Sequence, residues 1–253
     1  MFLIKNIVRD SMLKFFQFIY TLWALLIFHI FMIILFPVFL IPPMIHKKGI
    51  HLSFKAIRLW SLLFSTFNRI IYKIKGTENF NKKENYVVIS NHTSFLDTPA
   101  IAQAIDAPFK ALAKKELTKI PIFGFLIKMI TEVVDRSNPT SRQKSKERLN
   151  EVLENESSIL VFPEGTMNRT DQPLQRFYDG AFRIAIDAQA PILPIVIKDA
   201  AKLMKPSSFL MKPGKVHVQI LPPISTEGLT QKDLPKLKEE VMEKMKAELI
   251  DKI

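Results

Sequence analysis

The feature that most constrains this chain is a long uncharged and strongly apolar stretch near its N-terminus. Residues 15–46 contain no Lys, Arg, Asp or Glu and include the run FIYTLWALLIFHIFMIILF. A helix needs about 20 apolar residues to cross the hydrocarbon core of a bilayer. The stretch is therefore long enough for one membrane span, or for a helix bent at Pro37, Pro42 and Pro43 that enters and leaves on the same side.

Two other interpretations of this stretch fit less well. A cleaved signal peptide has a shorter apolar region, of about 7 to 15 residues, followed by a small-residue cleavage site that is missing here. A buried pair of helices in a soluble protein would not need so long an uncharged run. We therefore predict a membrane-anchoring segment.

The charges beside the stretch indicate its orientation. Up to Gly76 the chain has ten basic residues and one acidic residue, Asp10, within a total net charge of +12. Lys47 and Lys48 follow the stretch directly, so the positive-inside rule favours a cytoplasmic C-terminal side. Such a cluster suits anionic membrane lipid as a partner better than nucleic acid, for which the chain has no recognition motif.

Residues 57–75, IRLWSLLFSTFNRIIYKIK, alternate large apolar and basic side chains. This pattern predicts an amphipathic helix, either in the lipid headgroup region or packed on the following domain. We assign residues 1–71 to the membrane-anchoring unit and residues 72–253 to a catalytic domain.

The remainder alternates between strand and helix patterns. Short apolar runs rich in β-branched residues predict strands at residues 86–89, 158–162, 192–197 and 216–221. Helices are predicted after Asn138-Pro139, at residues 182–188, and at the C-terminus, where Leu237, Val241, Met245 and Leu249 share one face. This alternation predicts an α/β fold with a largely parallel or mixed central sheet flanked by helices.

The composition excludes several kinds of catalytic and metal-binding site. The chain has no Cys, which excludes thiolate nucleophiles and Cys-ligated metals. Its seven glycines do not form a dinucleotide-binding loop, a P-loop or a serine-hydrolase elbow. The five histidines include no H-x-x-x-H pair, so we expect no metal site.

Two motifs at strand ends carry the candidate chemistry. In the first, NHTSFLD, His92 and Asp97 lie five residues apart across a turn after a strand, where Asp97 could orient the imidazole as a general base. Alternatively, Asp97 caps the next helix and His92 is a turn residue. In the second, FPEGT, a carboxylate, a glycine and a hydroxyl (Glu164, Gly165 and Thr166) meet at the end of another strand.

Together these motifs resemble the glycerolipid acyltransferases, in particular the 1-acyl-sn-glycerol-3-phosphate acyltransferases. The resemblance extends from about Lys75 through further matching elements, which are GTEN at 76–79, AKKEL at 113–117, IPIFG at 120–124, DRS at 135–137, GAFRIAI at 180–186 and LP at 193–194. It implies transfer of a fatty acyl group from acyl carrier protein or coenzyme A to the hydroxyl of a lysophospholipid, without a further cofactor.

The resemblance also implies roles for individual residues. It makes His92 the base, Asp97 its orienting partner, and Asn91, Glu164, Gly165 and Thr166 parts of the substrate site. Direct transfer also makes Ser94 a weak candidate for a nucleophile. With no Cys and no serine elbow, the residues agree that a covalent acyl-enzyme is disfavoured.

The acceptor phosphate requires cations, and here the chain departs from the family pattern. Met167 follows Thr166 where an arginine is usual, and Tyr178 stands where a basic residue is common. By resemblance Arg136 is the best phosphate contact, with Lys114 and Arg169 as further candidates. Another lysophospholipid or a lyso-aminolipid therefore remains an alternative acceptor, and a non-catalytic membrane-docked module that binds lipid or acyl carrier protein is an alternative function.

Overall fold

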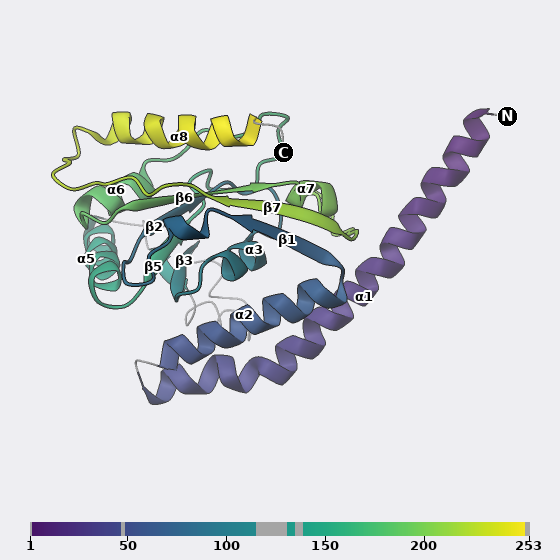
Figure 1. Cartoon of the computed structure of the whole chain (residues 1–253), viewed down its shortest axis with the longest axis horizontal. Coiled ribbons are helices and arrows are strands. Elements are labelled where there is room, and N and C mark those ends of the chain that lie inside the picture. The colour runs from purple at the N-terminus through teal and green to yellow at the C-terminus, as the bar shows by residue number, and fades with distance from the viewer. Residues whose placement is uncertain (1, 47–48, 115–130, 135–138, 251–253) are drawn as a thin grey trace.

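The structure is a computed structural model of the 253-residue chain, and it describes residues 2–46, 49–114, 131–134 and 139–250. Two helices, α1 (Phe2–Ile45) and α2 (Gly49–Phe67), form the N-terminal part. In Figure 1 the first half of α1 projects away from the rest of the protein, and α2 runs back along its second half. The apolar stretch is thus the longer arm of a helical hairpin.

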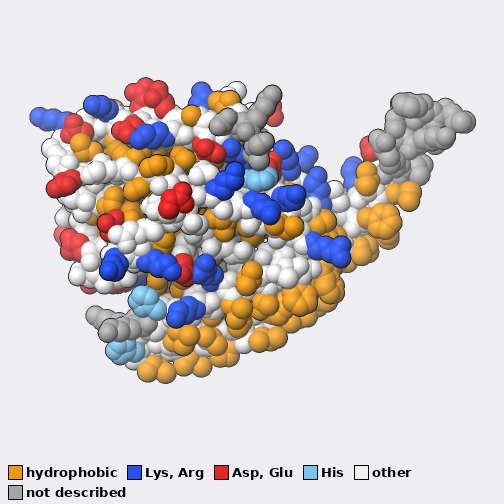
Figure 2. Space-filling model, in the orientation of Figure 1, with side chains coloured by type: hydrophobic (Ala, Val, Ile, Leu, Met, Phe, Trp, Pro, Cys, Tyr) orange, Lys and Arg blue, Asp and Glu red, His pale blue; other side chains and the backbone are white. Residues whose placement is uncertain are grey.

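One helix among the described residues is long and apolar enough to cross a membrane, and it is the segment Asp10–Ile45 of α1. Most of its large apolar side chains are exposed, and only a narrow stripe that includes Ala24 and Ile27 is buried against the domain. Figure 2 shows this apolar surface as a continuous layer along the helical hairpin. A surface of this kind is compatible with lipid contact.

The prolines of α1 lie within the helix, and a serine of α2 compensates for two of them. Pro42 and Pro43 have no N–H, so the carbonyls of Val38 and Phe39, one turn earlier, have no helical donor. The buried Ser53 hydroxyl donates to Phe39 O at 2.9 Å, with a second contact to Val38 O at 3.3 Å. The proline pair therefore also provides a binding point for α2.

The predicted helix over residues 57–75 is wrong in its last third. Helix α2 ends at Phe67, where the Asn68 side chain donates to Phe64 O and Arg69 adopts a left-handed conformation with φ 49°. Residues 70–75 form the edge strand β1 (Ile70–Lys75) instead. Alternating Ile and charged residues suit one strand of a sheet as well as a short piece of helix, and pairing with a distant strand decides between them.

The central sheet has seven strands. Their order is β1-β7-β6-β2-β5-β3-β4, and all neighbours are parallel except β6 and β7. The strands after β1 are β2 (Val87–Ser90), β3 (Phe109–Lys114), β4 (Thr131–Val134), β5 (Ser158–Val161), β6 (Ile192–Lys198) and β7 (Gly214–Ile220). The predicted α/β fold with a mixed sheet is confirmed, although β1, β3 and β4 were not predicted as strands.

The remaining helices are short, apart from two of 17 residues. They are η1 (Thr77–Asn79), α3 (Asp97–Ala104), α5 (Pro139–Asn155), α6 (Gly180–Asp187), α7 (Ala200–Leu203) and α8 (Leu234–Ile250). Helices α5, α6 and α8 agree with their sequence patterns. In α8, Leu237, Val241 and Met245 are buried as the spacing of four predicts.

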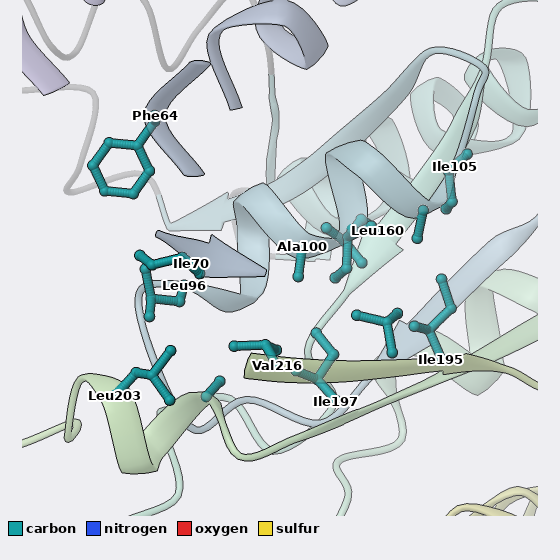
Figure 3. Packing of buried hydrophobic residues seen from close by; sticks show 14 of the residues in the cluster. Phe64, Ile70, Leu96, Ala100, Ile105, Leu160, Ile195, Ile197, Leu203 and Val216 are labelled. Carbon is teal, nitrogen blue, oxygen red and sulfur yellow. The ribbon is translucent and has the colours of Figure 1, made fainter. Parts of the chain in front are cut away.

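Helices cover both faces of the sheet and enclose two cores. Alternate residues of β2 point to opposite faces, so Val88 belongs to one core and Val87 and Ile89 to the other. The first core lies between the sheet and helices α1, α2, α3 and α7, and Figure 3 shows part of it around Ala100, Leu160 and Ile197. The second core packs α5, α6 and α8 against the opposite face. The helical hairpin is therefore part of the folded domain's packing.

Candidate active site

The site begins where β2 ends, in the middle of the sheet. Asn91 follows the strand and is fully buried. Its side chain donates to Ile197 O and accepts from Ile197 N, which ties the end of β2 to β6. Both ends of the amide have partners within the protein, so Asn91 positions the turn that follows, and its expected contact with substrate stays a prediction.

His92 and Asp97 are in direct contact across this turn. The distance from His92 Nδ1 to Asp97 Oδ2 is 2.9 Å. The Asp97 side chain is fully buried, whereas 17% of the His92 side chain is exposed. The pair thus has a hidden carboxylate and an imidazole that solvent can reach.

Asp97 also holds the turn itself. Its Oδ2 atom accepts hydrogen bonds from the backbone N–H of Thr93 and of Ser94, at 2.7 and 2.8 Å. These donors precede Asp97, and no side-chain cap is present at the start of α3, so the helix-cap interpretation does not describe this residue. Burial raises the pKa of Asp97, while hydrogen bonds from His92, Ser94 and Thr93 act in the opposite direction.

The Ser94 hydroxyl is not available as a nucleophile. It is buried, donates to Met204 O at 2.8 Å and accepts from Leu96 N at 3.2 Å. A hydroxyl that serves as a structural link between two segments cannot also attack a substrate carbonyl without breaking that link. Its contacts agree with the low weight given to Ser94 from the sequence.

The FPEGT motif follows β5, which lies beside β2 in the sheet. The two carboxylate oxygens of Glu164 accept from the backbone N–H of His92 and of Gln175, each at 2.9 Å. Glu164 is almost fully buried, and burial raises its pKa against the opposing effect of these two donors. The oxygens of Glu164 therefore join the two halves of the site, and its expected contact with substrate stays a prediction.

Two further contacts of His92 were not predicted. The Phe162 ring stacks on the imidazole, with centroids 4.1 Å apart and an angle of 19° between the planes. Asn168 N donates to His92 O at 2.6 Å. Both residues flank the FPEGT turn, so recognising that β2 and β5 are neighbours would have suggested them, but the sequence does not show which strands pair.

Gly165 and Thr166 are exposed at the mouth of the site. Gly165 has φ 71°, a conformation that glycine adopts more readily than other residues. A Cβ atom added to it would lie 3.0 Å from the Tyr178 ring, which covers this turn. Tyr178, noted in the sequence as a departure from the family pattern, is therefore a wall of the candidate site.

Of the three candidate phosphate contacts, only Arg169 has a side chain within the described part of the structure. Arg169 is exposed and lies three residues after Thr166, the last residue of FPEGT. Lys114 is the last residue of β3, and its side chain lies outside the described part of the structure. Arg136 lies outside the described residues, as do most of the AKKEL element and all of IPIFG and DRS. Within the described part of the chain no group of three His, Asp or Glu side chains is arranged to hold a metal ion.

The fold and the geometry at the ends of β2 and β5 define an acyltransferase. The sequence model of the Acyltransferase family matches residues 71–198, and the chain belongs to this family. That range extends from β1 through β6 and includes His92, Asp97 and Glu164. The family expected from the motifs is confirmed.

Three named proteins indicate which kind of acyltransferase this chain is similar to. The chain is 35% identical to a 1-acyl-sn-glycerol-3-phosphate acyltransferase of Saccharomyces cerevisiae over 68% of its own length and 58% of the yeast protein. It is 32% identical to a mouse 1-acyl-sn-glycerol-3-phosphate acyltransferase alpha, over 84% of this chain and 75% of the mouse protein. The crystal structure of the 1-acyl-sn-glycerophosphate acyltransferase PlsC from Thermotoga maritima aligns with a TM-score of 0.78 at 26% identity, covering 93% of this chain and 95% of that one.

Proposed function

We propose that this protein transfers a fatty acyl group from an acyl thioester to the sn-2 hydroxyl of 1-acyl-sn-glycerol-3-phosphate, giving phosphatidic acid. The observation that carries the mechanism is the contact between His92 Nδ1 and the buried Asp97 carboxylate. The names of relatives in yeast and mouse, and of the similar structure from Thermotoga maritima, support this substrate.

The contact with Asp97 determines which imidazole nitrogen can act as a base. We assign the proton on Nδ1 from its hydrogen bond to the carboxylate, which leaves a lone pair on Nε2. His92 Nε2 then removes the proton of the acceptor hydroxyl while the oxygen attacks the thioester carbonyl carbon. When the tetrahedral intermediate collapses, the C–S bond breaks and the imidazolium returns the proton to the leaving sulfur, so the histidine is regenerated.

The surroundings of His92 suit the positive charge that develops on it. Asp97 faces Nδ1, and the Phe162 ring lies against the face of the imidazole. A carboxylate and an aromatic face each stabilise a neighbouring cation. Both interactions strengthen as the ring gains its proton, so they favour the transition state over the ground state.

The oxyanion needs N–H donors that are not already in use. The amides of His92, Thr93 and Ser94 donate to Glu164 or Asp97, so these three are already in use. The amide of Gly165 donates to Phe162 O. Among the described residues Thr166 N has no acceptor, so we assign the oxyanion to this amide, one residue beyond the glycine.

For the acceptor phosphate we propose Arg136, with Lys114 and Arg169 as further contacts. An arginine can hold two phosphate oxygens at once, whereas a lysine contributes a point charge. Arg136→Ala should raise the acceptor KM and leave kcat largely unchanged, because the phosphate lies away from the reacting bond. An unchanged acceptor KM would move this role to the other two cations.

A different lyso-acceptor is the second candidate function, and Met167 and Tyr178 are the observations that favour it. They replace two basic residues of the family pattern, and Tyr178 lies against Gly165 at the mouth of the site. With fewer cations, the site is less selective for a phosphomonoester. A lysophospholipid or lyso-aminolipid would use the same base and the same thioester chemistry.

The donor is an acyl thioester of coenzyme A or of acyl carrier protein, which serves as co-substrate, and the mechanism needs no further cofactor. The base, its orienting carboxylate and the oxyanion donor all come from the chain itself. We propose that residues 72–253 hold the catalytic domain, although its first strand begins slightly earlier, at Ile70.

We further propose that residues 1–71 anchor the protein to a membrane whose anionic lipids attract the flanking lysines, with the catalytic domain on the cytoplasmic face. The support is the exposed apolar surface of α1 and the basic residues on either side of the apolar stretch. Protease added to right-side-out and to inverted vesicles tests the orientation, since the catalytic domain should be degraded only in the inverted ones.

Acyl transfer by the purified, detergent-solubilised protein tests the proposal. Lysophosphatidate and a long-chain acyl thioester should give phosphatidic acid with the native protein but not with His92→Ala, while other lyso-acceptors are assayed in parallel. Product only from another acceptor would keep the mechanism and change the substrate. Lipid binding without product from any acceptor would favour the alternative of a non-catalytic binding module.

A further inference from the structure

A short loop between α7 and β7 presents an exposed aromatic ring beside the active-site turn. We call residues 204–213 the Phe209 loop; it is closed by an antiparallel bridge between Met204 and Met211. Phe209 is 76% exposed and stacks on Phe95, itself 52% exposed, with ring centroids 6.2 Å apart and planes inclined by 17°. Phe95 lies within the turn that joins His92 to Asp97.

The Phe209 loop is fastened to both the active-site turn and the apolar helix α1. Ser94 of the turn donates its hydroxyl hydrogen bond to Met204 O at 2.8 Å. On the other side, Met211 N donates to the buried Thr21 hydroxyl of α1 at 2.9 Å. Figure 1 shows the end of the loop beside α1, where that helix leaves the domain. The position of the two rings relative to the apolar helix is therefore fixed by hydrogen bonds.

The charge around the loop has a single sign. Residues 200–226 contain four lysines and neither Asp nor Glu. Lys205 and Lys212 of the loop are exposed, and neither forms an ion pair with a carboxylate of the described residues. Figure 2 shows basic side chains gathered above the apolar surface of α1 at this end of the molecule. Exposed aromatic rings flanked by unpaired lysines match the apolar and anionic layers of a lipid headgroup region.

We propose that the Phe209 loop binds the surface of an anionic lipid bilayer, with Phe95 and Phe209 inserted among the headgroups and Lys205 and Lys212 on lipid phosphates. The loop is a second membrane contact, separate from the apolar face of the helical hairpin, and it sets the depth of the His92 turn so that a membrane-embedded acceptor reaches the base. The inference rests on the proposed function in taking a membrane lipid as acceptor.

A fluorescent label tests the contact without requiring turnover. The chain has no Cys, so Ser207→Cys, at an exposed position of the loop, gives a single site for an environment-sensitive dye such as NBD. Ser225→Cys is the matched control, since Ser225 is exposed beside the bridge at the opposite end of β6. With equimolar phosphatidylcholine–phosphatidylglycerol vesicles the emission at position 207 should rise and shift to the blue, while that at position 225 stays unchanged. Unchanged emission at 207 while the labelled protein sediments with the vesicles would overturn the proposal.

Two sets of variants separate the aromatic and charged contributions. Phe209→Ser should lower the rate on acceptor embedded in vesicles about tenfold, because a buried phenylalanine contributes that much to partition, and should leave the rate on a monomeric short-chain acceptor unchanged. Ile250→Ser, which changes an exposed apolar residue of α8, is the control and should alter neither rate. Equal rates for Phe209→Ser and native protein on vesicles would contradict the aromatic insertion.

Lys205→Glu combined with Lys212→Glu should reduce the preference for anionic over neutral vesicles at least about fivefold. An unchanged preference would overturn the assignment of these lysines to lipid phosphates. The monomeric acceptor reports on the proposed acyl transfer itself. Loss of activity on that acceptor would therefore count against the proposed function, whereas the label at position 207 counts for or against the Phe209 loop.

Discussion

The described part of the protein contains two histidine–aspartate pairs with the same contact distance and different surroundings. His92 Nδ1 lies 2.9 Å from Asp97 Oδ2, and His217 Nδ1 lies 2.9 Å from Asp199 Oδ2. The first pair follows β2 in a turn, at the ends of parallel strands. The second lies at the sheet's antiparallel part, with His217 in β7 and Asp199 directly after β6. The distance between histidine and aspartate therefore does not distinguish the two pairs.

The other contacts of each carboxylate do separate the pairs. Asp97 is fully buried, and among the described residues the His92 imidazole is the only titratable group that hydrogen-bonds to its Oδ2 atom, whose other donors are backbone N–H groups of the same turn. Asp199 is partly exposed and also binds Lys202 Nζ at 2.6 Å. A lysine that shares the carboxylate weakens its effect on the histidine, and no second ring stacks on His217 within the described residues. The proposed role of His92 as general base therefore rests on the burial of its carboxylate and on its pairing without a lysine of the described residues, and not on proximity alone.

The largest effect should come from breaking each pair in turn. His92→Ala should lower kcat about a thousandfold, because general-base catalysis contributes that much, while His217→Ala should leave kcat unchanged. Steady-state acyl transfer with both variants measures this difference. Comparable losses in the two variants would mean that the environment of the carboxylate does not determine which histidine is the base.

The second effect concerns Glu164, which accepts a hydrogen bond from the backbone N–H of His92. Glu164→Gln replaces one acceptor oxygen by an NH₂ group that faces an N–H, so one of the two links from Glu164 to His92 N and Gln175 N is lost. We expect kcat to fall about tenfold and the free energy of unfolding to fall by about 1–3 kcal/mol. Denaturant unfolding and kinetics on the same preparation check both. Native kcat with reduced stability would show that Glu164 supports the fold without positioning His92.

Replacing Phe162, whose ring stacks on His92, should have a smaller effect on kcat. Phe162→Leu keeps an apolar side chain but removes the aromatic face against His92, and this interaction is worth about 0.5–1.5 kcal/mol. We therefore expect kcat to fall about fivefold, because the positive charge that develops on the imidazole loses a stabilising neighbour. Steady-state acyl transfer measures this, and a native kcat in Phe162→Leu would exclude a role for the aromatic face.

The smallest effect should be on the pH dependence of the free energy of unfolding. Asp97 and Asp199 should change it in opposite directions. Burial raises the pKa of Asp97, so native Asp97 stabilises the fold least at high pH. For Asp199, partial burial is outweighed by Lys202 and His217, which lower its pKa, so its contribution is present at neutral pH and lost in acid. The change for Asp97 occurs at and above the ordinary aspartate pKa of about 3.9, which applies to the unfolded chain, whereas the change for Asp199 occurs at and below it.

Substitution by asparagine measures these signs. From about pH 4 to pH 7, the stability of Asp97→Asn relative to the native protein should increase. Asp199→Asn should lose stability relative to the native protein as the pH rises from acid to about pH 4. We expect this loss to be about 0.5–1 kcal/mol. Thermal or denaturant unfolding at several pH values gives both curves. Slopes of the same sign would contradict the difference in environment.

Much of the fold followed from local patterns. The strands β2, β5, β6 and β7 are short apolar runs bounded by turn residues, and α8 has an apolar residue every fourth position. Such patterns depend only on neighbours in the sequence and are therefore visible without a structure. Strand β1 was missed because residues 70–75 fit a helix equally well, and its pairing partner β7 is more than a hundred residues away.

The candidate site was predictable in part for the same reason. His92 and Asp97 are joined by one turn, so their contact could be expected from their spacing. The roles of Asn91 and Glu164 were not, because their partners Ile197, Gln175 and the amide of His92 come from other strands and loops. A polar side chain in a motif suggests a ligand contact, and only the structure shows which hydrogen-bond partners it has within the protein.

The sequence by itself determined the long apolar N-terminal helix, the α/β class and the residue types proposed for acyl transfer, since these follow from composition and short-range spacing. Only the tertiary structure decided that Phe162 stacks on His92 and that the Ser94 hydroxyl donates to Met204 O. It also decided that, among the described residues, a lysine pairs with the carboxylate of Asp199 but not with that of Asp97. The physical reason is that burial and pairing depend on which distant segments pack together, and the order of strands in the sheet is set by the packing of the whole chain.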